Sequence, residues 1–169
     1  MYVVCGGKRT EPDYLRALGR SRRNPAVAVT LAGKGWAPEK LVSHAMSRVG
    51  DFDQVWCVLD VDEFDFVTAV RAAGKGRVRL AVSNPCFELW LLLHHETCGA
   101  SLTPSEVTRR LRRHVPRYDK RNLVFAHFAT GVDDAVERGR RLDAGTAVGP
   151  NPSSGVWLLV DTIMKEATA

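Results

Sequence analysis

The chain of 169 residues lacks the features that mark secreted, membrane-spanning and disulfide-bonded proteins. Its four cysteines form no CxxC pair, and three of them lie inside or beside apolar runs, where a reduced thiol packs as a small hydrophobic group. The strongest apolar run, residues 89–93, is far too short for a membrane span, and no apolar segment of a signal peptide precedes Lys8 and Arg9. We therefore expect a cytoplasmic protein in a reducing compartment, with no membrane among its partners.

Charge is modest in total and uneven along the chain. The formal net charge is +5, which divides into +6 over residues 1–50, −5 over 51–108, +6 over 109–121 and −2 over the remainder. Residues 51–65 contain six acidic side chains and no basic one. Acids beside basic segments suit a divalent-metal site acting on phosphates, because the metal neutralises carboxylates while Lys and Arg hold the polyanion. The structural alternative places the acids in loops and the arginines on a solvated helix face.

Hydrophobic periodicity predicts an α/β fold for the first half of the chain. Short apolar runs rich in β-branched residues predict four strands, at residues 2–5, 26–31, 54–59 and 78–82. Amphipathic segments predict helices that start near residue 10 and cover residues 38–49 and 64–73. This alternation indicates a mostly parallel four-stranded sheet flanked by helices, with the functional groups at the carboxyl ends of the strands.

The second half of the chain is predicted to be helical. Asn84 is expected to cap, and Pro85 to begin, a helix that reaches about Glu96 and is apolar almost all round, so that it should be buried. Further helices are expected at residues 104–115, 132–142 and 156–164, with an exposed loop at 143–155. We expect one domain over residues 1–169, made of an α/β core (1–97) and a helical cap (98–169) packed on it.

Asp60 and Asp62 follow the most apolar strand. Carboxylates two residues apart on an extended segment point the same way, so this pair, with Glu63 beside it, can bind Mg²⁺ or Mn²⁺. An Asp-x-Asp after a hydrophobic strand occurs in haloacid dehalogenase-type phosphatases, metal-dependent glycosyltransferases and Toprim domains. The phosphatases have Gly-Thr where this chain has Glu63-Phe64, and the glycosyltransferases need a larger domain. The arrangement of a Toprim domain therefore fits best. The structural alternative is a carboxylate that caps the following helix.

Glu88 lies in the first turns of the apolar helix. Burying a carboxylate costs free energy unless the group is paired, protonated or bound to metal. The functional interpretation makes Glu88 a metal ligand or general base near Asp60. The structural alternative pairs Glu88 with an Arg or Lys, or places it favourably in the helix dipole. His94 and His95 lack metal-ligand spacing with Cys98, and we expect them to be structural.

Five segments together resemble a known family. They are residues 5–12 (CGGKRTEP), 58–63 (VLDVDE), 83–94 (SNPCFELWLLLH), 118–120 (YDK) and 151–154 (NPSS). In this order they are similar to RloB-like proteins, and the similarity spans nearly the whole chain. The resemblance implies a Toprim-like nuclease that cleaves DNA or RNA and acts in antiphage defence, in restriction-linked or abortive-infection loci, with an RloA-like partner ATPase. It would place metal on Asp60 and Asp62, with Glu88, Asn84, Lys120 and His94 as further pattern residues.

One position departs from the family pattern. The family and its Toprim relatives place a glutamate directly after the first strand, where this chain has Gly6. Glu11 also matches the family pattern and is the candidate to act with Asp60, Asp62 and Glu88 in catalysis. The alternative is a catalytically inactive Toprim-like subunit that binds nucleic acid or the ATPase.

Basic residues form the candidate nucleic-acid surface. Residues 109–121 read RRLRRHVPRYDKR, in which Tyr118 can stack on a base and Lys120 can contact phosphate. The full candidate set is Lys8, Arg9, Arg109, Arg112, Arg113, Tyr118, Lys120 and Arg121. The same composition also suits an acidic protein partner, and a homo-oligomer stays open.

Overall fold

The computed structural model describes residues 1–23, 28–31, 36–61 and 66–166. In these ranges five strands form one sheet in the order β2-β1-β3-β4-β5. The strands are β1 (Tyr2–Cys5), β2 (Ala28–Leu31), β3 (Val55–Asp60), β4 (Arg79–Asn84) and β5 (Ser153–Ser154). The first four are parallel, and β5 is antiparallel to β4. The predicted α/β class with a mostly parallel sheet is confirmed.

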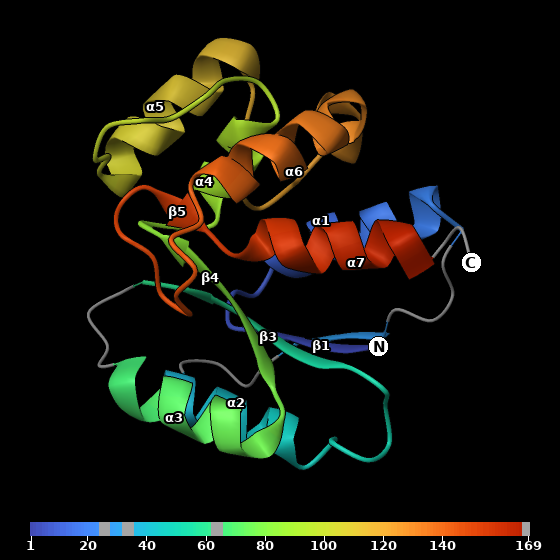
Figure 1. Cartoon of the computed structure of the whole chain (residues 1–169). Helices are drawn as coiled ribbons and strands as arrows, with labels where there is room; N and C mark the ends of the chain where they lie inside the picture. The colour runs from blue at the N-terminus through green and yellow to red at the C-terminus, as the bar shows by residue number, and fades with distance from the viewer. Residues whose placement is uncertain (24–27, 32–35, 62–65, 167–169) are drawn as a thin grey trace.

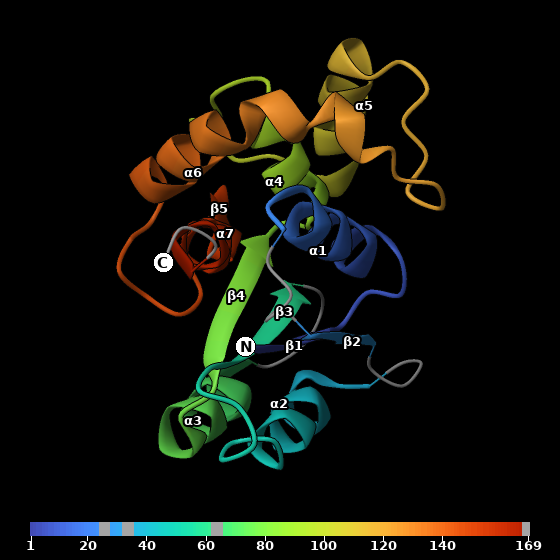
Figure 2. The same cartoon turned by 90° about the vertical axis from the view of Figure 1, so that its right-hand side faces the viewer.

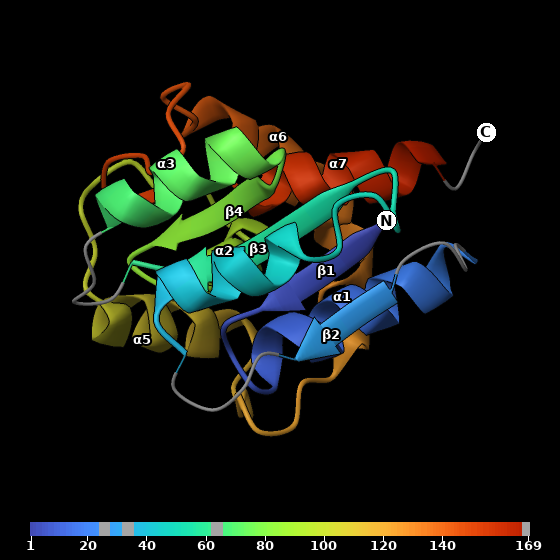
Figure 3. The same ribbon diagram turned by 90° about the horizontal axis from the view of Figure 1, so that it is seen from below.

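Helices cover both faces of this sheet. The described ranges contain α1 (Thr10–Ser21), α2 (Pro38–Met46), α3 (Phe66–Gly76), α4 (Glu88–Leu93), α5 (Pro104–His114), α6 (Val132–Arg141) and α7 (Val156–Glu166). Helices α2 and α3 cover one face, and α1 and α7 cover the other (Figure 1). Helices α4, α5 and α6 lie beyond α1 and α7, so that the view from below shows α2 and α3 in front of the sheet and the remaining helices behind it (Figure 3).

The central strand β3 shows why this sequence gives a covered sheet. Its side chains alternate between the two faces, and all but the last residue are buried. Cys57 and Leu59 belong to the hydrophobic cluster beneath α2 and α3, whereas Trp56 and Val58 belong to the larger cluster on the opposite face. That larger cluster also includes Leu111 and other apolar residues of α5, α6 and α7, so the C-terminal helices share their core with the sheet.

Strand order determines where side chains can converge. The chain passes from β1 outward to β2 and then returns across β1 to β3, so the order reverses between the adjacent strands β1 and β3. At such a reversal the connections leave on opposite faces and a crevice opens at the carboxyl ends. Figure 2 shows the carboxyl ends of β3 and β4 pointing toward the side on which α1 and α4 lie.

Two predictions about residues 83–155 are wrong. The predicted loop 143–155 contains β5, whose Ser154 pairs with Ser83 of β4 and shares a buried hydroxyl contact of 2.9 Å with it. The sheet therefore has five strands and not four. The predicted helix 85–96 covers only Glu88–Leu93, because Asn84 is the last residue of β4 and its Nδ2 donates to the Gly149 carbonyl instead of capping the helix.

No helix in the described part of the chain is long and apolar enough to cross a membrane.

Candidate functional site

A cleft of about 360 Å³ opens where the strand order reverses. Its walls come from the segment after β1, the end of β3, the start of α4 and the loop after α5. The lining residues are Gly7, Lys8, Arg9, Thr10, Glu11, Asp60, Phe87, Glu88, Lys120 and Arg121. Side chains separated by more than 100 positions along the chain therefore meet at one edge of the sheet.

Three of the four predicted catalytic acids line this cleft. Glu11 lies in the first turn of α1, Asp60 is the last residue of β3, and Glu88 is the first residue of α4. Asp62 and Glu63, the other predicted metal ligands, lie outside the described residues. The convergence follows from the parallel sheet, because residues after adjacent strands leave the same edge.

Glu11 is the most enclosed of these acids, with only 6% of its surface exposed. Burial raises the pKa of its carboxyl group, and the nearby Glu88 carboxylate raises it further, whereas backbone hydrogen bonds at Glu11 and Gly7 and the charge of Lys120 act against the rise. The carboxylate lies over Gly7, and a Cβ atom at position 7 would clash with both of its oxygens. Glycine at position 7 therefore makes room for the acid.

Glu88 is held by a neutral donor. The hydroxyl of Tyr118 donates to Glu88 Oε1 at 3.1 Å. Burial first, and then the charges of Glu88 and Asp60, raise the pKa of the Cys86 thiol, so this thiol keeps its proton. In the described part of the chain the polar partner of Glu88 is thus a tyrosine, and not the Arg or Lys of the structural alternative.

Tyr118 itself is placed differently from its prediction. Its ring is 7% exposed and belongs to the main hydrophobic cluster, so it offers no free face for stacking on a base. Burial, and then the neighbouring Glu88, raise the pKa of its hydroxyl and keep it protonated. A basic segment with one aromatic residue resembles a nucleic-acid surface in sequence, but here the aromatic residue anchors the segment to the core.

Four of the predicted basic residues also line the cleft: Lys8, Arg9, Lys120 and Arg121. The Arg9 guanidinium donates to the Arg121 carbonyl, and Thr10 Oγ1 donates to the Lys120 carbonyl, each at 3.1 Å. These two bonds fasten the loop after α5 to the segment after β1. The basic side chains are therefore carried by backbone that is fixed on the rim of the cleft.

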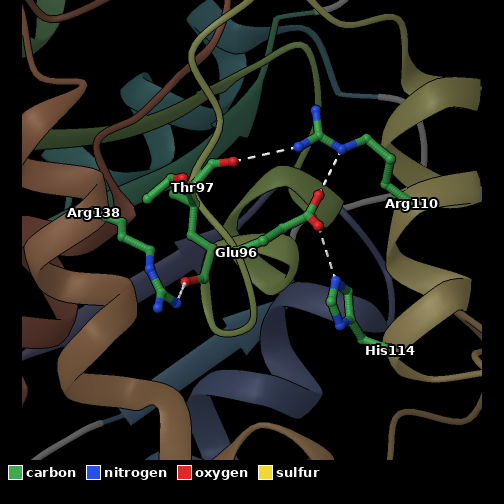
Figure 4. A network of polar contacts seen from close by, with 6 residues as sticks. Glu96, Thr97, Arg110, His114 and Arg138 are labelled. Atoms are coloured by element: carbon green, nitrogen blue, oxygen red, sulfur yellow. Dashed lines mark hydrogen bonds and ion pairs between the residues drawn. The ribbon is translucent and has the colours of Figure 1, made fainter.

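The other predicted basic residues, Arg109, Arg112 and Arg113, are exposed on α5 and do not line the cleft. Their neighbour Arg110 turns inward and donates to Glu96 at 2.5 Å and to the Thr97 carbonyl at 3.3 Å (Figure 4).

His114 bonds the second oxygen of Glu96 at 3.0 Å, and Arg138 of α6 donates to the Leu93 carbonyl at 2.7 Å. Burial alone would raise the pKa of Glu96, but the hydrogen bonds from His114 and Arg110 outweigh it and lower the pKa. This network joins α5 and α6 to the end of α4 and fixes the helix that carries the exposed arginines.

Gly6, the departure from the family pattern, has room for a side chain. A Cβ atom there would lie 3.4 Å from the Val58 carbonyl oxygen and 3.5 Å from methyl carbons of Leu41 and Leu59, which are ordinary contact distances. An adjoining hollow of about 150 Å³ lies between Gly6, Gly7, Glu11 and Asp60 and the apolar side chains around Leu41. Glycine at position 6 is thus not required by packing.

The donor chemistry of the cleft suits a hard divalent cation, because all three acids offer carboxylate oxygens. Among the residues that the structure describes, however, no group of three His, Cys, Asp or Glu side chains is close enough to hold a metal ion. Asp62 and Glu63, the other predicted metal ligands, lie outside these residues.

The remaining pattern residues have structural contacts. His94 Nε2 accepts a hydrogen bond from the Tyr14 hydroxyl at 2.9 Å, and His94 Nδ1 donates one to the Trp90 carbonyl at 2.9 Å. Burial lowers the pKa of this imidazole to about 3. His94 is thus a neutral core residue. Sequence reasoning missed Gly7 and Cys86; the available signals were a second glycine four residues before Glu11 and a cysteine two residues before Glu88.

Comparisons with known proteins give one result. Neither the curated proteins nor the solved structures contain a significant match. The family model described as RloB-like protein matches residues 1–163, nearly the whole chain. The protein therefore belongs to the RloB-like family.

Proposed function

We propose that this protein is a metal-dependent nuclease of Toprim type that cleaves phosphodiester bonds in DNA or RNA. The observation that carries the proposal is the cleft at the carboxyl ends of β1 and β3, which is lined by Glu11, Asp60 and Glu88 together with four basic residues. Carboxylates bind Mg²⁺ or Mn²⁺, and lysine and arginine bind the phosphates of a nucleic acid. Family membership and the Asp-x-Asp after a buried strand support the same function.

Five residues that line the cleft have a role in this proposal. Asp60 and Glu88, together with Asp62, would hold the cation, which would polarise the phosphate and activate a water molecule. Glu11 would accept the proton that the attacking water releases, because its raised pKa makes it a better proton acceptor than an ordinary glutamate. Lys120 and Arg121 orient the phosphate, since their backbone is fastened to the rim.

A substrate panel tests this function. Purified protein is incubated with plasmid DNA, single-stranded DNA and tRNA in Mg²⁺ or Mn²⁺, and in EDTA. We expect cleavage of at least one substrate in metal and none in EDTA. Equal cleavage in EDTA, or none of any substrate, contradicts the proposal.

A second candidate function is a non-catalytic subunit that binds nucleic acid or a partner protein. One observation favours it: Gly6 stands where the family pattern has glutamate. Position 6 accepts a Cβ atom at ordinary contact distances and lines a hollow of about 150 Å³, so Gly6→Glu is the variant to test. Cleavage gained only in Gly6→Glu supports this candidate, whereas cleavage by the unchanged protein supports the nuclease.

In the cell, we propose a cytoplasmic effector of antiphage defence that acts with an RloA-like ATPase, and membership of the RloB-like family supports this role. Co-expression with such an ATPase, followed by affinity purification, tests the partnership. Light scattering during gel filtration of the purified chain tests for a homo-oligomer.

A further inference from the structure

We infer that Tyr118 is a positioning residue that fixes the Glu88 carboxylate inside the cleft. The inference rests on the proposed function, because it assigns a purpose to one acid of the proposed metal site. The loop after α5 would then position Glu88 as well as carry Lys120 and Arg121.

The contact between these two residues is directional. The Tyr118 hydroxyl donates to Glu88 Oε1 at 3.1 Å, and the ring is 7% exposed within the main hydrophobic cluster. A packed tyrosine has few rotatable bonds, so its hydroxyl is a fixed point. The glutamate has a longer flexible side chain and is only partly buried. The tyrosine therefore restrains the glutamate, and not the reverse.

The backbone that carries Tyr118 is itself fixed on both sides. Before it, the Tyr118 amide donates to the Val115 carbonyl at 2.9 Å. After it, the carbonyls of Lys120 and Arg121 accept the bonds from Thr10 and Arg9. The position of a cleft acid is thus set from the C-terminal helical part of the chain.

The Tyr118 hydroxyl leaves part of the Glu88 carboxylate for a ligand. An ionised carboxylate has about four lone-pair sites. Tyr118 donates one hydrogen bond to Oε1 of Glu88, so this bond leaves other lone pairs of the carboxylate for a cation in the cleft. Groups that orient a ligand in this way typically contribute about 10-fold to 100-fold in metal affinity.

The first test is Tyr118→Phe, which removes the hydroxyl and keeps the ring. We expect Mn²⁺ affinity, measured by calorimetry, to fall about tenfold or more. The matched control is Tyr14→Phe, which also deletes a buried tyrosine hydroxyl, but one that bonds His94. We expect this control to lower the melting temperature and to keep the Mn²⁺ affinity. Unchanged affinity in Tyr118→Phe, or the same loss in both variants, overturns the inference.

A double-mutant cycle separates positioning from a general structural effect. If Tyr118 acts through Glu88, then Glu88→Gln lowers Mn²⁺ affinity, and adding Tyr118→Phe lowers it no further. Independent, additive losses overturn the inference while the proposed function stands. If Glu88→Gln itself leaves both Mn²⁺ affinity and cleavage unchanged, the metal site assigned to Glu88 is wrong, and the inference falls with it.

Discussion

Substituting Gly7 tests how the cleft holds its most buried acid. A Cβ atom at position 7 would occupy the space of the Glu11 carboxylate, so Gly7→Ala must push this group out of the site. Gly7 does not adopt the left-handed backbone conformation, so alanine fits the backbone itself and should change the free energy of unfolding by no more than about 1 kcal/mol. The loss of a positioned proton acceptor should slow cleavage by roughly 100-fold to 10,000-fold.

The neighbouring glycine supplies the matched control. Gly6→Ala places a Cβ atom at 3.4 to 3.5 Å from its nearest neighbours and does not meet Glu11, so we expect it to cleave at the rate of the unchanged protein. The assay compares single-turnover cleavage rates and melting temperatures of the two variants. An NMR titration of the Glu11 carboxyl carbon gives a second measurement, in which the raised pKa falls toward the ordinary glutamate range in Gly7→Ala. An unchanged cleavage rate and an unchanged Glu11 pKa in Gly7→Ala would show that Gly7 does not hold the Glu11 carboxylate in the cleft.

Three further results follow from the contacts described above. Burial raises the pKa of Glu11 in the folded protein above its ordinary value of 4.5, so the contribution of Glu11 to stability is present below that value and is lost as pH rises through the raised pKa. Glu11→Gln should therefore raise the melting temperature at pH 8 and not at pH 4. Thr103→Ala removes the capping box that Thr103 forms with Glu106, and urea unfolding should show a loss of about 1 kcal/mol with unchanged cleavage. Lys120 lines the cleft, so Lys120→Ala should lower the slope of log affinity against log salt concentration for duplex DNA by about 1. Lys165 pairs with Asp161 outside the cleft, so Lys165→Ala should leave this slope unchanged.

The sequence predicted the sheet well because its strands are long enough to show a pattern. The continuous apolar run that forms β3 indicated a strand buried on both faces, and Glu11 and Asp60 were expected after strands of one parallel sheet. Parallel strands share one carboxyl edge, so these acids were predicted to lie along that edge. The strand order that brings β1 beside β3 was not available from periodicity.

Features set by distant contacts could not be predicted in the same way. Strand β5 has two residues and shows no periodicity, and it exists because Ser153 and Ser154 pair with the end of β4. Helix α4 begins at Glu88 because Asn84 is held in the sheet. Tyr118 lies in a strongly basic segment, but packing against the core turns its ring inward. In each case a tertiary partner, absent from the local sequence, decides the outcome.

The most direct test of the account is the Mn²⁺-dependent cleavage rate of Asp60→Asn, measured beside Asp51→Asn. Asp60 lines the cleft, whereas Asp51 is an exposed acid paired with Arg48 on another part of the surface. If the cleft is a metal-dependent nuclease centre, Asp60→Asn loses cleavage and Asp51→Asn keeps it, with both variants folded. Equal cleavage rates in Asp60→Asn and the unchanged protein would contradict the account.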